Sequence, residues 1–249
     1  MLSVLKSEFR KLLTIRSTYL VTLGTLALAA LLNFIAAQQQ GSSIMTPFYM
    51  HDTAIFLGID LFATFAAIVA ILHVAHEYRY NTITYTLTIV NRRIKVFLAK
   101  TTVIIAYSLL IGALVVLVSY WAAKWGFAVK HVTVVAQHLA MWPLIWQSAA
   151  YILGNSLIAM LLALLIRSLV GAIVAYFFLP VIEQLLALLM HDNVKYLPFN
   201  TLNQVGVTST AGPGIKHALS PIHALGLLAI YLVVLYAVTL VLFIRRDAN

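Results

Sequence analysis

Two acidic residues, Asp60 and Glu183, lie inside long apolar stretches of the sequence. An ionised side chain at the centre of a bilayer costs about 2.5–3.5 kcal/mol on insertion scales, so residues of this kind often serve a function. Together with Asn155 they are candidate polar groups of a transmembrane pathway. The alternative is that each acid is protonated or hydrogen-bonded between packed helices, or reaches outward to the interface.

The histidines do not follow a zinc-binding pattern. His73 and His76 are three residues apart, which places them on one face of a helix, and they adjoin Glu77. Zinc needs three or four converging ligands, and no H-E-x-x-H motif is present. The remaining histidines fall on the opposite side of the membrane predicted below. We therefore predict no metal site, and histidines that cap helix ends.

No catalytic motif is found. The chain has no G-x-x-x-x-G-K-[ST] loop to hold a nucleotide phosphate and no G-x-S-x-G nucleophile turn. It also has no cysteine, which excludes disulfides, thiolate metal sites and a cysteine nucleophile. We predict that this chain is not an enzyme by itself, with no catalytic residues and no cofactor of its own.

The composition indicates the membrane as the place where these polar groups are held. Of 249 residues, 63% are hydrophobic and 9% are charged, and the mean hydropathy is +0.98. Soluble domains have about 45–50% apolar and about 25% charged residues, so a free cytosolic enzyme and a disordered chain are excluded.

Six apolar runs are long enough to cross a bilayer as helices, which predicts an all-α, polytopic membrane protein forming a single transmembrane domain over 1–249. The predicted helices are 17–37, 54–75, 101–121, 146–166, 169–190 and 223–244.

The basic residues predict the orientation. Of the 16 Lys and Arg, 12 fall before the first helix, between the second and third, between the fourth and fifth, and after the sixth. Because basic residues concentrate on the cytoplasmic side, both termini are expected in the cytoplasm. The net charge of +9 is thus a topology signal and gives no reason to expect nucleic acid.

Three segments lie outside the predicted helices. Residues 2–16 have apolar residues at helical spacing with basic flanks, which predicts an amphipathic helix on the membrane surface; the alternative is a basic flank that only sets topology. Residues 76–100 form the one sizeable cytoplasmic connection, and a short helix or turn presented to another protein is favoured over a lone strand. Residues 191–222 are predicted to be an extracellular loop.

Three stretches resemble the membrane-spanning permease subunits of type-2 ABC exporters. Residues 5–20, LKSEFRKLLTIRSTYL, are similar to the N-terminal helix of many bacterial members. Residues 77–83, EYRYNTI, followed by Leu87, Arg92 or Arg93, and Lys100, resemble the connection between the second and third helices. Residues 166–173 resemble the turn between the fourth and fifth helices. Asn81 departs from the family pattern, which usually has glycine there, and so does the absence of a proline near position 90.

The resemblance implies an ATP-driven exporter in a bacterial plasma membrane. Two permease subunits, as a homodimer or a heterodimer, would form the pathway, and separate ABC ATP-binding subunits carrying ATP and Mg²⁺ would dock beneath, with membrane lipid around the helices. The implied ATPase-coupling residues are Glu77, Arg79, Thr82, Arg92, Arg93 and Lys100. Two alternatives remain open: an intramembrane enzyme that uses Asp60, Glu183 or the histidines, and a non-transporting immunity or scaffold protein of the membrane.

Overall fold

The structure, a computed structural model, describes residues 2–39, 44–45, 56–89, 93–131, 133–134, 141–206 and 217–245. Apart from one pair of two-residue strands, the elements in these ranges are helices. Six of the helices are long and apolar enough to cross a membrane, which confirms the prediction of six. They are α2 (Arg16–Gln39), α4 (Phe56–Arg79), α6 (Arg93–Val129), α7 (Met141–Ile166), α8 (Leu169–Met190) and α10 (Pro221–Arg245).

Shorter elements connect them. An N-terminal helix, α1 (Leu2–Thr14), precedes α2, and α5 (Thr82–Ile89) connects α4 to α6. Between α8 and α10 lie a 3-10 helix, η2 (His191–Tyr196), and α9 (Pro198–Val205). The strands β1 (Ile44–Met45) and β2 (Thr133–Val134) pair in parallel, with Ile44 opposite Thr133.

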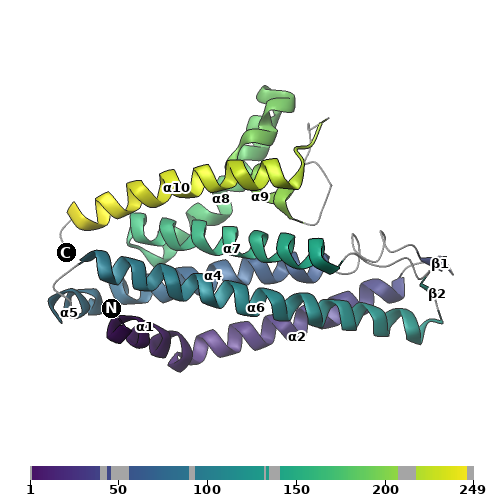
Figure 1. Ribbon diagram of the computed structural model, residues 1–249, viewed down its shortest axis with the longest axis horizontal. Coiled ribbons are helices and arrows are strands. Elements are labelled where there is room, and N and C mark those ends of the chain that lie inside the picture. The colour runs from purple at the N-terminus through teal and green to yellow at the C-terminus, as the bar shows by residue number, and fades with distance from the viewer. Residues whose placement is uncertain are drawn as a thin grey trace.

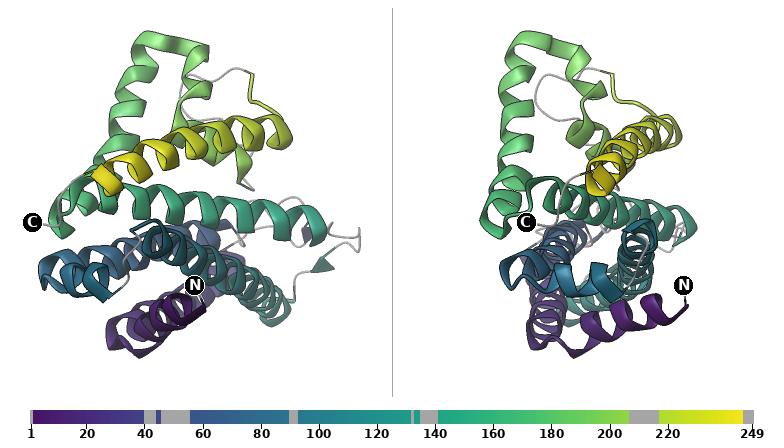
Figure 2. Two further views of the ribbon diagram at one scale, coloured as in Figure 1. Left: turned by 60° about the vertical axis from the view of Figure 1, so that its left-hand side comes forward. Right: turned by 90° about the vertical axis from the view of Figure 1, so that its left-hand side faces the viewer.

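The core forms around α4, which packs against α2, α6 and α7 and runs beside them in one layered bundle (Figure 1). Its alanines at positions 63, 66, 67 and 70 are each at most 1% exposed. Small side chains let helix backbones approach closely, which is how helices pack where lipid removes the hydrophobic drive between them. α10 crosses α7, whereas α8 rises away from the bundle (Figure 2), and these two helices are the least buried of the six.

One end of the bundle gathers elements that are distant in the sequence. This end contains α1, α5, the last turn of α4, the first turns of α6 and the end of α10 (Figure 1). The Arg93 guanidinium, at the start of α6, donates to the carbonyl of Ile244 near the end of α10 at 3.1 Å. We call this end the α1 end.

The observed bounds differ from the predicted ones most at α6, which begins at Arg93 and ends at Val129 rather than spanning 101–121. The charges of Lys95 and Lys100 interrupt the apolar run from which the helix was predicted, but they do not end the helix itself. Lys100 is neutralised by residues that the apolar pattern does not reveal. Segment 76–100 therefore consists of the end of α4, the helix α5 and the start of α6. The predicted loop 191–222 contains η2 and α9.

Candidate functional site

At the α1 end, five ionisable side chains from three helices form one cluster, which we call the charged cluster. It consists of Glu8 and Lys11 from α1, His73 and Glu77 from α4, and Lys100 from α6. The Lys100 ammonium lies 2.8 Å from both Glu8 Oε2 and Glu77 Oε1. The Lys11 ammonium lies 2.6 Å from Glu8 Oε1 and 2.7 Å from Glu77 Oε1. The two lysines thus bridge the two carboxylates, and α1 is tied to both α4 and α6.

These ion pairs matter for stability because most of the groups that form them are buried. The Lys100 side chain is 0% exposed and the Glu8 side chain 1%, so neither charge is solvated by water. A buried charge without a partner is strongly destabilising. Here the charges of the two carboxylates and the two ammonium groups sum to zero, so each buried charge has a partner. His73 places Nε2 3.2 Å from Glu8 Oε2 and, when neutral, leaves that balance unchanged.

The cluster shifts the pKa of both of its members that come from α1, Glu8 and Lys11. Burial raises the pKa of Glu8, but His73, Lys100 and Lys11 lower it by more, so the pKa lies well below its ordinary value. Burial lowers the pKa of Lys11, but the carboxylates of Glu77 and Glu8 raise it by more, so the pKa is above its ordinary value. Both groups are therefore charged at neutral pH.

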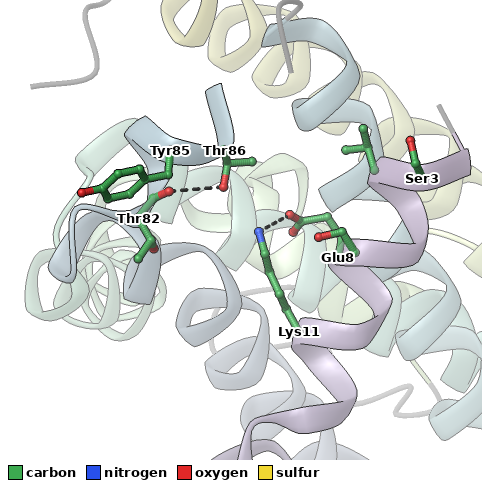
Figure 3. A pocket seen from close by; sticks show the side chains of 8 residues that line it. Ser3, Glu8, Lys11, Thr82, Tyr85 and Thr86 are labelled. Atoms are coloured by element: carbon green, nitrogen blue, oxygen red, sulfur yellow. Dashed lines mark hydrogen bonds and ion pairs between the residues drawn. The ribbon is translucent and has the colours of Figure 1, made fainter. Parts of the chain in front are cut away.

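A cavity of about 400 Å³ opens beside the cluster, between α1 and α5 (Figure 3). Glu8 and Lys11 meet on its α1 side, and Thr86 donates to the carbonyl of Thr82 on its α5 side (Figure 3). A second cavity of about 390 Å³ includes Lys11 and Thr82 together with His73 and Glu77. The charged cluster is thus reached from the surface on two sides.

Among the described side chains of the helix α5, one is buried in the core and others are exposed. Ile83 is 2% exposed and anchors the helix in the core, whereas Tyr85 is 72% exposed. The preceding Tyr80 is 64% exposed. Tyrosine contributes large contact area and a hydroxyl at the loss of few rotamers, which is why it is enriched where proteins dock. This surface suits a protein partner.

The structure brings some of the predicted coupling residues together and separates others. Glu77 and Lys100 are in the charged cluster, and Thr82 lies at both cavities, with its hydroxyl 3.5 Å from the carbonyl of Glu77. Arg79 is exposed on the side of α4 that faces away from the charged cluster, with its guanidinium 5.6 Å from the centre of the Tyr80 ring. Arg93 joins α6 to α10, and Arg92 lies outside the described residues.

Two of the three predicted pathway residues belong to one polar network within the membrane-spanning helices. Tyr151 of α7 donates to Asp60 Oδ1 at 2.6 Å, and the Asn155 amide donates to the carbonyl of Tyr151 at 3.0 Å. Tyr176 of α8 then donates to Asn155 Oδ1 at 2.6 Å. Asp60 is exposed at the surface of the chain, whereas Asn155 is 5% exposed.

Glu183 lies apart from this network and holds α9 in place. Its carboxylate accepts hydrogen bonds from the backbone amides of Phe199 and Asn200, both at 2.9 Å, and from the Asn200 side chain at 3.0 Å. These amides belong to the first turn of α9, which has no intrahelical acceptor for them. The N-cap position, Leu197, offers no side-chain hydrogen bond, so Glu183 supplies the cap from α8.

Sequence reasoning did not identify Glu8, Lys11 and His73 as members of one site. A signal for Glu8 was present, because it is three residues after Leu5 and four before Leu12, on the apolar face of α1. Within the described ranges, no group of three or more His, Cys, Asp or Glu side chains is arranged to hold a metal ion.

Comparison with known proteins gives one family match. A family model described as "Protein of unknown function (DUF2705)" matches residues 26–248, about nine-tenths of the chain. The charged cluster therefore joins α1, which precedes the matched range, to α4 and α6 within it. A search of proteins with curated functions gives no match.

Proposed function

The chain belongs to the DUF2705 family, and we propose that it is the membrane-spanning permease subunit of an ATP-driven ABC exporter in a bacterial plasma membrane. In this proposal the α1 end faces the cytoplasm, with α1 at the membrane surface. The chain works as a dimer, and separate ABC ATP-binding subunits dock at the α1 end.

The observation that carries the proposal is the arrangement of α5 beside α1 over the charged cluster. α5 offers a docking surface through Tyr85 and is continuous with neither α4 nor α6. Next to it, Lys11 and Lys100 tie α1 to the two core helices. A displacement of α1 by a partner docked on α5 would pass to α4 and α6 through these ion pairs, which supports a coupling role.

The first test asks whether the partner exists. The full chain is extracted from its native membrane in mild detergent, and proteins that remain bound are identified by mass spectrometry. We expect a subunit with a G-x-x-x-x-G-K-[ST] motif. Movement of a substrate by this chain in vesicles without any nucleotide-binding subunit would overturn the proposal.

The second test locates the docking surface. Tyr85→Ala removes a side chain that is 72% exposed, so the fold is retained while affinity for the ATP-binding subunit falls at least about tenfold. Leu110→Ala is the matched control, since Leu110 is 69% exposed in the middle of α6 and distant from the α1 end. Equal affinity of the two variants would contradict docking at α5.

The third test separates coupling from passive attachment. Glu77→Ala removes a carboxylate that both Lys11 and Lys100 contact, so the ATPase rate of the bound partner should change clearly. A non-transporting immunity or scaffold protein predicts an unchanged rate. An intramembrane enzyme predicts instead that Asp60→Asn and Glu183→Gln abolish a turnover that does not require ATP. The separate places of Asp60, in the tyrosine–asparagine network, and Glu183, at the cap of α9, favour the exporter.

A further inference from the structure

A third cavity at the α1 end is lined by basic residues and lies on the other side of α4 from the charged cluster. It measures about 390 Å³ and is formed by the end of α4, the turn between α7 and α8, and the start of α8. Its lining residues are Tyr78, Arg79, Arg167, Ser168, Leu169 and Val170. Two of the six carry guanidinium groups and none is acidic. The lining is therefore basic.

The acid that is nearest in sequence does not neutralise this charge. Glu77 precedes Tyr78 and Arg79, but its carboxylate is 8% exposed and is bound by Lys11 and Lys100 in the charged cluster. Arg79 itself is exposed and makes no ion pair with a described residue; its guanidinium lies against the Tyr80 ring. Its hydrogen-bond donors are available to a ligand.

The fold brings the second guanidinium to the same cavity. Arg167 directly follows α7: its backbone amide donates to the carbonyl of Ala163 at 3.0 Å, and its φ of 57° turns the chain toward α8. The Arg167 guanidinium carbon lies 5.7 Å from the centre of the Tyr78 ring, so the side chain is held over the last turns of α4. The end of α4 and the turn between α7 and α8 thus bring the two arginines to one cavity.

Neutral donors accompany the two charges. The buried hydroxyl of Tyr78 has no hydrogen-bond partner among the described residues, and a buried hydroxyl without a partner is unfavourable unless a ligand supplies one. Ser168 caps α8 by accepting from the amide of Gly171 at 3.3 Å, which fixes the first turn of this 22-residue helix at the cavity. The first turn of a helix adds a positive potential.

We propose that this cavity binds a phosphate group, either the phosphodiester of a membrane phospholipid or a free phosphate. Guanidinium groups present a planar set of donors that matches the oxygens of phosphate, and their hydrogen bonds to phosphate are charge-assisted. Arg79 is the last residue of α4 and Leu169 the first of α8, so the cavity lies where two membrane-spanning helices end. Lipid headgroups are found at this level of a bilayer.

The test uses the purified full-length chain in neutral detergent and measures binding of two probes by thermal shift and by titration. One probe is inorganic phosphate, and the other is a short-chain phosphatidylglycerol. We expect saturable binding of at least one. Tighter binding of the lipid identifies a headgroup site, and equal or tighter binding of phosphate alone identifies a site for the free ion.

Variants assign the binding to the cavity. Arg79→Gln keeps an exposed polar side chain, so the fold is retained while affinity falls about tenfold or more. Arg10→Gln is the matched control, because Arg10 is an exposed arginine at the α1 end that does not line the cavity. No saturable binding of either probe, or an equal loss in the two variants, would overturn the proposal. Since the ATP-binding subunit is absent, failure here is distinct from failure of the exporter proposal.

Discussion

Lys100→Met is expected to release α1 from the bundle. The Lys100 ammonium is fully buried and contacts both carboxylates of the charged cluster at 2.8 Å, so its removal leaves two carboxylates with Lys11 alone. Breaking a buried ion pair by removing one partner costs about 3–5 kcal/mol. Part of that loss falls on the contact between α1 and α6, because Glu8 is on the helix that can leave.

The assay uses the absence of cysteine in the chain. A Leu12→Cys substitution places the only thiol at a residue of α1 that is 3% exposed, where a maleimide reacts when α1 opens. If about 3 kcal/mol is lost from the docked state, the labelling rate rises about a hundredfold. Lys95→Met in the same background is the control, since Lys95 makes no ion pair with a described residue.

A second substitution tests whether charge balance is what holds α1 in place. Adding Glu8→Gln to Lys100→Met removes one carboxylate and leaves Glu77 with Lys11, whose atoms are 2.7 Å apart. Since the remaining charges again sum to zero, the double variant should label more slowly than Lys100→Met alone. If Lys100→Met labels at the control rate, or if the second substitution makes labelling faster still, charge balance does not hold α1.

Glu183→Ala leaves the first amides of α9 without an acceptor, so protease cleavage between α8 and α10 should become faster and stability should fall by about 1–3 kcal/mol; Glu183→Gln, which keeps one acceptor oxygen, should lose less. Gly126→Ala places a Cβ 2.7 Å from a backbone carbonyl of α2 and should lower the melting temperature through a loss of about 1–3 kcal/mol, whereas Gly24→Ala, with no atom within 4 Å of the new Cβ, should not. Because the pKa of Glu8 is lowered, the carboxylate stabilises the docked α1 at every pH above the ordinary carboxyl pKa, and this stabilisation is lost only at lower pH. Because the pKa of Lys11 is raised, the ammonium group stabilises the docked α1 at every pH below the ordinary lysine pKa, and this stabilisation is lost only at higher pH. Labelling at Leu12→Cys, normalised to an exposed Ser3→Cys, should therefore stay flat from about pH 7 to about pH 9, above the range in which His73 of the same cluster titrates when exposed; a rise within that window would contradict one of the two shifts.

Hydropathy is sufficient to predict the number of membrane-spanning helices, because the apolar runs needed to cross a bilayer are long and have few competing explanations. It does not predict where α6 begins. Lys100 interrupts the apolar pattern and yet lies in the helix interior, since Glu8 and Glu77 neutralise it from two other helices. Contacts of this kind join residues 92 positions apart and leave no local pattern.

The candidate site was predictable only in part, because most of its contacts join residues that are distant in the sequence. Helical spacing predicts that α1 has one apolar face, and Glu8 falls on it, but two of its three partners, His73 and Lys100, come from distant parts of the chain. Asp60 and Glu183 look alike in sequence, as acids in apolar runs, and the structure separates them. Asp60 accepts from a tyrosine of α7, whereas Glu183 replaces a missing N-cap of α9, a role that depends on the path of residues 191–197.

The unbroken course of α6 has a mechanical consequence. Its 37 residues correspond to a rod of about 55 Å at 1.5 Å per residue, longer than a bilayer with its headgroup layers. Lys100 lies near one end of this rod and Gly126, against α2, near the other. A tilt of about 5° at the base would displace the far tip by about 5 Å. α6 can therefore act as a rigid lever that pivots at its base, so that a small rotation at one face of the membrane becomes a displacement of several ångströms at the other.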